Sequence, residues 1–330
     1  MAELFADLLG QPRAVALLAA ALERRRLAPA YLFAGPDGVG RRLAARRFLE
    51  GVLTGGARPD PALRRRLAQG NHPDVLWVEP TYNHQNQLVP VSAALAQGLA
   101  RRAPPQLRLE QIREVSRFLG RRPVEGERCL VVLEAAERMA EPAANALLKT
   151  LEEPGGGLLV LICAAPEQLL STIRSRCQPV PFSRLSPELL QRVLAELPPA
   201  PGDADAPGAA EPELPAEPPE LLELAAGSPG ALLAHRSQWR ALPVGLAERL
   251  LNLAADPLEA LALARDLCEA LDAEQQLWLL DWWQLALWRR QKPLRPAPPR
   301  RLERLRAHLR AYVQPRLAWE VALLELARSG

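Results

Sequence analysis

A short glycine-rich segment has the spacing of a loop that binds phosphate groups. Gly35, Gly38 and Gly40 are followed directly by Arg41 and Arg42. In a working loop, G-x-x-x-x-G-K-[ST], backbone amides surround the phosphates, the lysine reaches the β and γ phosphates and the hydroxyl binds Mg²⁺. Here the glycines are in place, whereas arginines stand at the lysine and hydroxyl positions. Because a guanidinium offers Mg²⁺ no ligand, the segment predicts a phosphate loop that has lost its usual metal chemistry.

A second candidate group is an acidic residue at the end of a buried strand. The apolar run Leu130–Leu133 is followed by Glu134 and Ala135. A hydrolysing site places one acid there for the metal and a neighbouring glutamate to polarise water. Glu134 could still reach a metal, but Ala135 stands where the water-activating acid belongs. We therefore expect no hydrolysis by this chain. Binding of ATP or ADP without hydrolysis stays open, since the backbone of the loop survives.

A third candidate group is the tripeptide Ser175, Arg176 and Cys177, which follows an apolar strand and a turn. An arginine that reaches across an interface can stabilise the charge on a transferring phosphate. Taken alone, Arg176 would favour a surface ion pair. Cys177 is interpreted as a small packing residue and not as a nucleophile, because no histidine lies near it in the sequence.

Several motifs occur together in a fixed order along the chain. They are Gly35–Arg42, Gln111–Arg113, Glu134–Met139, Asn145–Pro154 and Ser175–Cys177. In this order they resemble the clamp-loader ATPases of the AAA+ class, and among these the delta-prime family of the bacterial DNA polymerase III clamp loader. The resemblance covers about Leu9 to Phe182, and beyond it only the weaker Ala226–Gly230 matches.

The resemblance implies a role in DNA replication with no chemistry in this chain alone. In this family the arginine of the Ser-Arg-Cys motif enters the ATP site of the adjacent subunit. Arg176 is therefore the expected arginine finger, with Ser175 and Cys177 as its motif neighbours. The implied partners are the gamma/tau and delta subunits and, through the complex, the sliding clamp and primed DNA. The chain would be one part of an ATP-driven machine of the DNA polymerase III holoenzyme.

Two departures from the wider family bear on cofactors. Many bacterial relatives carry a four-cysteine zinc module before a segment like His72–Asp74, but residues 51–71 contain no cysteine. The four cysteines of the chain form no C-x-x-C pair, so no zinc and no disulfide are expected. Gly230 stands where active clamp-loader ATPases place a nucleotide-sensing arginine. Together with the altered loop, this argues against the ATP-hydrolysing gamma/tau subunit and for a chain that requires no cofactor.

The elements expected around these residues alternate between strands and helices. Apolar strands are expected at 30–34, 75–78, 129–133 and 158–163, and helices at 11–27, 41–53, 109–119, 142–152, 187–197 and 220–235. Residues 54–70 look like a loop, and 81–106 like an insertion or a flexible hairpin. This alternation predicts an α/β AAA+ P-loop module with a parallel sheet between helices. From Trp239 to Ser329 the pattern is helical throughout.

These elements divide into three expected domains. The AAA+ module spans 1–183, a small helical lid spans 184–236, and an all-α C-terminal collar for oligomerisation spans 237–330. The stretch 198–219 is dominated by Pro, Ala, Glu, Asp and Gly, which predicts a disordered insertion within the lid.

Composition is compatible with this interpretation but does not demand it. The net charge of +3 permits weak contact with nucleic acid. Of the 41 basic residues only Lys149 and Lys292 are lysine, which we interpret as a coding bias of the source genome. No apolar run approaches the length of a membrane helix, and the N-terminus lacks the pattern of a signal peptide, so a cytoplasmic protein without membrane contact is expected.

Two other functions remain as alternatives. An autonomous AAA+ ATPase that remodels DNA or protein would hydrolyse ATP as an isolated chain, against which Arg41, Arg42 and Ala135 all argue. A pure scaffold subunit would leave Arg176 inert, and only mutation of Arg176 separates it from a subunit that donates an arginine.

Overall fold

The first half of the chain is built on a parallel five-stranded sheet. The computed structural model describes residues 2–56, 59–84, 87–97, 104–153, 155–196, 217–290, 299–311 and 314–327. The strands stand in the order β2 (Val75–Val78), β5 (Leu130–Leu133), β6 (Leu158–Cys163), β1 (Ala30–Ala34) and β7 (Gln178–Pro181). Every pair is parallel, so the carboxyl ends of all five strands lie along the same edge. This confirms the predicted α/β fold.

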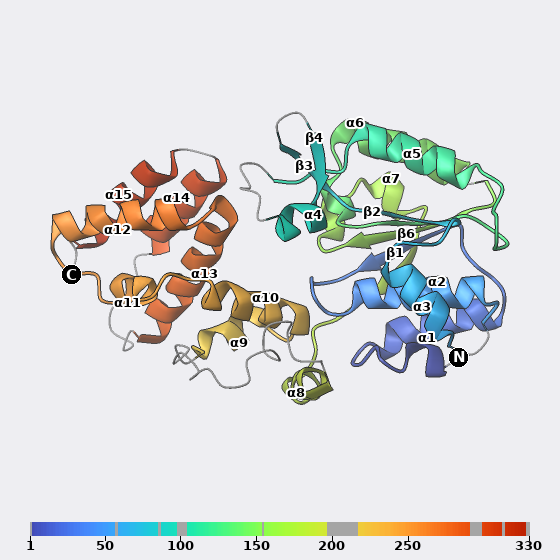
Figure 1. Cartoon of the computed structure of the whole chain (residues 1–330), viewed down its shortest axis with the longest axis horizontal. Helices are drawn as coiled ribbons and strands as arrows, with labels where there is room; N and C mark the ends of the chain where they lie inside the picture. The colour runs from blue at the N-terminus through green and yellow to red at the C-terminus, as the bar shows by residue number, and fades with distance from the viewer. Residues whose placement is uncertain are drawn as a thin grey trace. The chain divides into compact units, whose positions relative to one another are not determined.

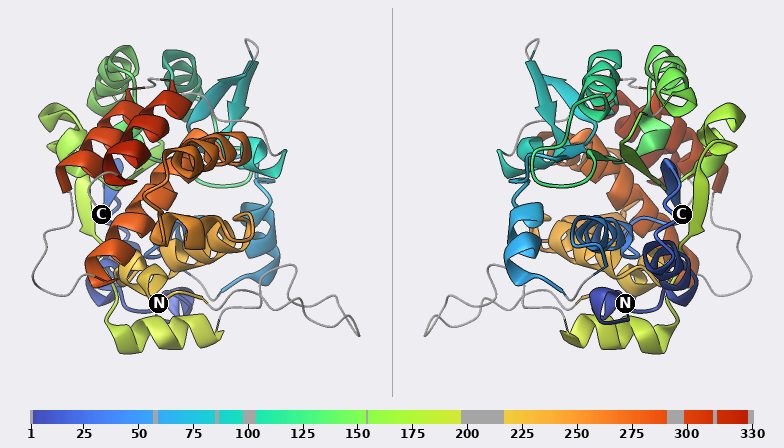
Figure 2. Two further views of the ribbon diagram at one scale, coloured as in Figure 1. Left: turned by 90° about the vertical axis from the view of Figure 1, so that its left-hand side faces the viewer. Right: turned by 90° about the vertical axis from the view of Figure 1, so that its right-hand side faces the viewer.

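Helices cover both faces of the sheet, because alternate side chains of the strands point to opposite faces. Tyr31 and Phe33 of β1 pack into a core with α1 (Pro12–Glu23) and α2 (Arg41–Leu53), whereas Leu32 packs into a second core. That second core contains α5 (Leu109–Leu119) and α6 (Glu141–Glu152). In Figure 1, α1 and α2 therefore lie below the sheet and α5 and α6 above it, and the side views of Figure 2 keep this vertical order. All residues of β5 and β6 are buried, as expected of central parallel strands.

Two local elements, a helix and an edge strand, differ from expectation, and a third segment contains the hairpin that was one of its two expected alternatives. The segment expected as a loop contains a helix, α3 (Pro61–Ala68). The segment 81–106 contains an antiparallel hairpin of β3 (Thr81–His84) and β4 (Gln87–Pro90), followed by α4 (Val91–Ala96). The edge strand β7 was not predicted, because its sequence Gln-Pro-Val-Pro has none of the usual strand pattern. Proline is tolerated there because the edge of a sheet leaves backbone N–H groups unused.

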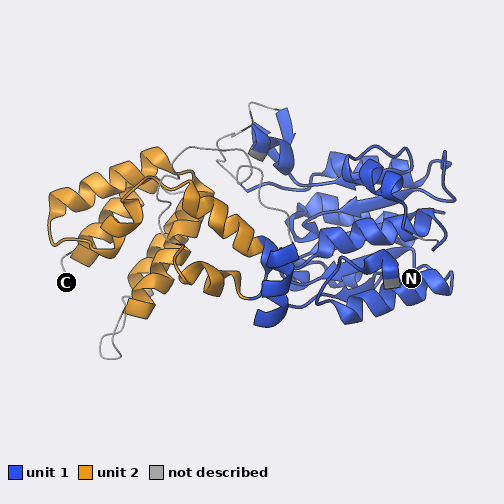
Figure 3. Ribbon diagram, turned by 60° about the horizontal axis from the view of Figure 1, so that its bottom comes forward, with its two compact units in different colours: residues 1–99, 103–198, 227–230 blue, residues 100–102, 199–226, 231–330 orange. Residues whose placement is uncertain are grey.

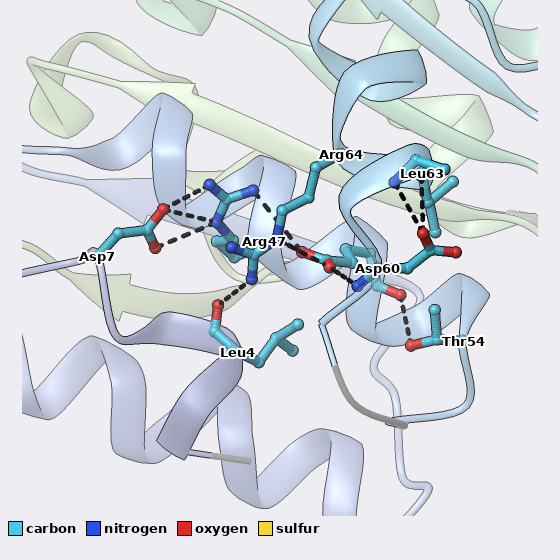
Figure 4. Close-up of polar contacts among 9 residues, drawn as sticks. Leu4, Asp7, Arg47, Thr54, Asp60, Leu63 and Arg64 are labelled. Atoms are coloured by element: carbon cyan, nitrogen blue, oxygen red, sulfur yellow. Dashed lines mark hydrogen bonds and ion pairs between the residues drawn. The ribbon is translucent and has the colours of Figure 1, made fainter.

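The segment before β2 is fixed by the buried carboxylate of Glu50. The side chain of Glu50 is fully buried and accepts hydrogen bonds from the backbone N–H of Asp60 at 2.8 Å and from Arg64 Nε at 2.8 Å. Arg47 Nη1 lies 3.7 Å from the same carboxylate and also binds Asp7, so the N-terminal segment, α2 and the start of α3 converge there (Figure 4). Asp60 in turn caps α3 by accepting the N–H of the two residues that follow Pro61.

The chain divides into two compact units (Figure 3). Unit 1 comprises residues 1–99, 103–198 and 227–230, and unit 2 comprises residues 100–102, 199–226 and 231–330. Unit 1 thus contains the sheet, the short α7 (Ser171–Arg174), α8 (Pro187–Glu196) and the segment 227–230. The expected division into three domains stays a prediction. Of the expected insertion at 198–219, residues 198–216 lie outside the part of the chain that the structure describes.

Unit 2 is helical, as its sequence predicts. Its helices are α9 (Glu220–Ala225), the greater part of α10 (Pro229–Arg240), α11 (Leu246–Leu251), α12 (Pro257–Ala270), α13 (Ala273–Arg290), α14 (Pro299–Arg310) and α15 (Pro315–Ala327). Its core contains Trp282, Trp283 and Trp319, of which Trp319 donates its indole N–H to buried Gln276 at 3.0 Å. Across the described part of the chain, no helix combines the length and apolar character needed to cross a membrane.

Candidate functional site

The glycine-rich segment forms the predicted turn between β1 and α2, at the carboxyl edge of the sheet (Figure 1). Gly40 is the residue before α2 and has φ of 102°, a backbone conformation that favours glycine. A Cβ atom at Gly35 would lie 2.3 Å from the carbonyl oxygen of Phe182, so only glycine fits there. The remaining glycine of the motif, Gly38, also has a positive φ. The glycine spacing thus correctly predicted the position of this turn between a strand and a helix.

The arginine at the lysine position is turned onto its own loop. The Arg41 side chain is 5% exposed, and its Nη2 donates to the carboxylate of Asp37 within the same loop. Arg41 Nη1 is also buried and has no hydrogen-bond partner among the described residues. A phosphate loop normally presents this cation to a bound phosphate. In this chain the anion that Arg41 contacts is the carboxylate of Asp37 and not a bound phosphate.

The arginine at the hydroxyl position is bound to the acid at the end of β5. Arg42 Nε lies 2.6 Å from Glu134 Oε1, and the indole N–H of Trp77 donates to the same oxygen at 2.5 Å. The side chain of Glu134 is 13% exposed. Burial raises the pKa of Glu134 above its ordinary value, and the positive charge of Arg42 and the hydrogen bond from Trp77 oppose that rise.

This arrangement does not fit a magnesium ion. A guanidinium already neutralises the carboxylate that would hold the metal, and the next residue, Ala135, has no acid to polarise water. Among the described residues, no group of three or more His, Cys, Asp or Glu side chains is placed to hold any metal ion.

The segment 228–230 lies directly on the phosphate loop, within unit 1. The backbone N–H of Gly230 donates to the carbonyl oxygen of Gly38 at 3.0 Å, and the hydroxyl of Ser228 donates to the carbonyl oxygen of Asp37 at 2.6 Å. A Cβ atom at Gly230 would lie 2.7 Å from Cα of Gly38. Position 230, where the family resemblance led us to expect the loss of a nucleotide-sensing arginine, therefore has no space for a Cβ atom unless the backbone at Gly38 shifts.

The Ser-Arg-Cys motif lies at the opposite side of the sheet from the glycine loop, where the parallel strands begin. Arg176 stands between α7 and β7, before the amino end of that strand, with its side chain 37% exposed. Its Nη2 donates to Glu152 Oε1 at 2.9 Å and its Nη1 to the carbonyl oxygen of Thr172 at 3.1 Å. Ser175 donates its hydroxyl to the same carbonyl at 3.1 Å. The structure thus keeps Arg176 and Ser175 together, away from the glycine loop.

Cys177 is 6% exposed, and burial raises the pKa of its thiol to about 12. At neutral pH the side chain is therefore a thiol that packs in the core and not a nucleophilic thiolate.

Two residues that matter at these sites were missed by sequence reasoning. Asp37 is four residues before Arg41, a spacing that pairs opposite charges across a turn and could have been noticed. Glu152 had no such signal, because its contact with Arg176 depends on how the end of α6 meets the turn after α7.

Comparison with known families covers most of the chain. The family described as "DNA polymerase III, delta subunit" matches residues 10–186. The family described as "Cyanobacterial DNA polymerase III delta prime, C-terminal domain" matches residues 208–326. The two matches therefore correspond to the sheet-containing half and to the helical half.

Individual relatives are also subunits of DNA polymerase III by name, two of them named subunit delta' and one named subunit tau/gamma. The chain is 35% identical to DNA polymerase III subunit delta' of Bacillus subtilis (strain 168), over 56% of this chain and 51% of the relative. It is 35% identical to the subunit delta' of Pseudomonas aeruginosa, over 71% of this chain and 66% of the relative. The chain thus spans about half to two thirds of the length of these two curated relatives. Identity to subunit tau/gamma of Haemophilus influenzae is 27%, over 69% of this chain and 29% of the relative.

Among solved structures, a DNA polymerase III gamma subunit-related protein from Thermotoga maritima has a similar fold. Its TM-score is 0.54 at 18% identity, covering 96% of this chain and 99% of that one. This likeness supports the fold of the chain.

Proposed function

The chain belongs to the DNA polymerase III delta-prime family, and from this premise we propose that it is a non-hydrolysing subunit of the clamp loader. It helps to place the sliding clamp on primed DNA in the cytoplasm, with gamma/tau and delta subunits as its neighbours. Its Arg176 enters the ATP site of an adjacent gamma/tau subunit and stabilises charge on the transferring phosphate.

One observation carries this proposal: Arg176 and the phosphate loop lie at opposite edges of the same sheet. The loop follows the carboxyl end of β1, whereas Arg176 precedes the amino end of the neighbouring parallel strand β7, in which Gln178 pairs with Tyr31. A strand rises about 3.3 Å per residue, so the length of β1 separates the two groups by on the order of 13 Å. A guanidinium needs direct contact to act on a phosphate. Arg176 is therefore suited to another subunit's nucleotide and not to a nucleotide on its own loop.

The internal ion pairs support the non-hydrolysing part of the proposal. Arg41 of the loop forms an ion pair with Asp37. Arg42 forms an ion pair with Glu134, the acidic residue at the end of β5, so both arginines have partners within the chain. We therefore propose that the chain requires neither nucleotide nor zinc for its role.

The test is DNA- and clamp-stimulated ATP hydrolysis by a reconstituted loader that carries either the wild-type chain or Arg176→Ala. Removing an arginine finger lowers turnover at the site it serves by about 10³-fold or more. Arg174→Ala is the matched control, because Arg174 is an exposed arginine of the same turn. Gel filtration must show that all variants assemble equally.

Two outcomes would change the assignment. Unchanged turnover with Arg176→Ala would reduce the chain to a scaffold. Magnesium-dependent hydrolysis by the isolated chain would instead support an autonomous ATPase, which the pairing of Arg42 with Glu134 disfavours.

A further inference from the structure

We propose that Glu152 is a positioning residue for Arg176, which holds the guanidinium in the orientation that a neighbouring subunit's phosphate requires. This inference rests on the function proposed above. It assigns a role to a residue at the end of α6 that lies outside the Ser-Arg-Cys motif.

The guanidinium of Arg176 is held at two points by two different elements. Nη2 donates to Glu152 Oε1 at 2.9 Å, at the end of α6, and Nη1 donates to the carbonyl oxygen of Thr172 at 3.1 Å, in α7. An arginine has five N–H donors in a rigid plane. Two of them are used in these contacts, and the other three remain for an incoming phosphate. The contacts therefore fix the plane of the group without exhausting its donors.

The ion pair contributes little to the stability of the fold. Glu152 is 54% exposed and Arg176 is 37% exposed. Solvent screens a pair this exposed, and such pairs stabilise proteins by a small and often unmeasurable amount. What the pair does change is the freedom of the arginine side chain, which would otherwise sample many rotamers.

Restricting those rotamers before assembly favours catalysis in trans. Charge stabilisation is effective when the donor is already oriented as the charge develops. Ordering one rotamer-rich side chain at an interface corresponds to about a two- to tenfold change in rate. Because ATP is bound by the neighbour's own loop, this effect falls on kcat and leaves KM for ATP unchanged.

The test compares Glu152→Ala, Glu152→Gln and Glu153→Ala in the reconstituted loader, with kcat and KM for ATP measured separately. We expect Glu152→Ala to lower kcat by about two- to tenfold at constant KM. Glu152→Gln should retain most of the activity, because the amide oxygen can accept the same hydrogen bond. Glu153→Ala is the matched control: Glu153 is the next residue and is exposed. It should behave as wild type.

A double variant and a spectroscopic measurement separate positioning from a general structural role. If Glu152 acts through Arg176, then Glu152→Ala adds no loss in an Arg176→Ala background. In the isolated chain, guanidinium NMR should show slow rotation of the Arg176 group in wild type and Glu152→Gln, and fast rotation in Glu152→Ala. Arg176→Lys identifies the resonance by its disappearance.

Each contrary result has a distinct meaning. Equal kcat for wild type and Glu152→Ala, in a loader that Arg176→Ala impairs, overturns the role of Glu152 and leaves the proposed function intact. A rise in kcat for both Glu152 variants would show that the carboxylate masks the arginine, which also overturns the inference. No loss with Arg176→Ala itself would overturn both the function and the inference.

Discussion

Replacing Glu50 by alanine should strongly destabilise unit 1. The Glu50 side chain is fully buried, and its carboxylate joins α2 to the segment before β2 by accepting from Asp60 N–H at 2.8 Å and Arg64 Nε at 2.8 Å. Alanine would leave both donors without their acceptor in a site shielded from water. The Arg64 side chain, 26% exposed, would also lose its counter-charge.

The size of the effect follows from burial. Removing one member of a buried, hydrogen-bonded ion pair costs about 3–5 kcal/mol, because a charge is left without compensation. That is a large part of the total of roughly 5–15 kcal/mol that holds a domain folded. Because 1.4 kcal/mol corresponds to a factor of about ten, amides that exchange through unfolding of unit 1 should exchange roughly a hundred- to several-thousand-fold faster.

The chain contains a control on the same helix. Arg66 of α3 binds Glu125 through two hydrogen bonds of 2.9 and 2.8 Å, but these side chains are 40% and 45% exposed. The two pairs have the same chemistry and differ in burial, so Glu125→Ala should leave the exchange of α3 amides close to wild type.

The assay is hydrogen exchange followed by mass spectrometry on the peptides that contain α2 and α3, at several pH values to confirm exchange at equilibrium. Comparable protection in Glu50→Ala and Glu125→Ala would refute the reasoning, since burial would then make no difference. A loss of protection confined to unit 2 would refute it as well.

Two further variants test the altered phosphate loop. In Arg42→Ala the buried carboxylate of Glu134, whose pKa burial already raises, loses the cation that opposes the rise. A folded-state pKa above the unfolded value means that stability is present at low pH and lost as pH rises through the folded pKa. The deficit in Tm against wild type should therefore be larger at about pH 7.5 than at about pH 5, and a deficit independent of pH would contradict this. Gly230→Ala places a Cβ 2.7 Å from Cα of Gly38 and should destabilise by about 1–3 kcal/mol in denaturant unfolding. Gly156→Ala, which meets nothing within 4 Å, should be neutral, and equal effects of the two changes would rule out the contact with Gly38 as the cause.

The parts of the fold that local pattern decides were predictable. The helix 41–53 and the strands 30–34 and 158–163 have the predicted bounds, because glycine spacing and continuous apolar runs mark them. The helix α3 was missed because only Leu63 and Leu67 are buried in it, too few for a clear periodic signal. Its position depends instead on the buried carboxylate of Glu50, which a local pattern does not reveal.

The candidate site was predictable in its residues but not in their partners. Sequence position predicted that Arg41, Arg42 and Glu134 lie around the glycine loop, and the structure places Arg41 on Asp37 of that loop and Arg42 on Glu134. That Arg42 would bind Glu134 depends on α2 passing close to the end of β5, which is a property of the tertiary fold. The contact of Gly230 with Gly38 joins residues far apart in the chain, and likewise required the structure.

The opposite placement of Arg176 and the phosphate loop gives the molecule a polarity. Modules that offer an arginine at one edge and accept one at the other can repeat head to tail, either closing into a ring or growing into a filament. In the function proposed above, this chain offers Arg176, which lies before the amino end of β7. At the carboxyl ends of the strands, Arg42 pairs with Glu134 and Gly230 contacts Gly38, an arrangement that does not fit a magnesium-dependent nucleotide site. Under the function proposed above, in which Arg176 serves a neighbour's nucleotide, this chain would suit a terminal position in such a row, and its place would mark where the row of active sites ends.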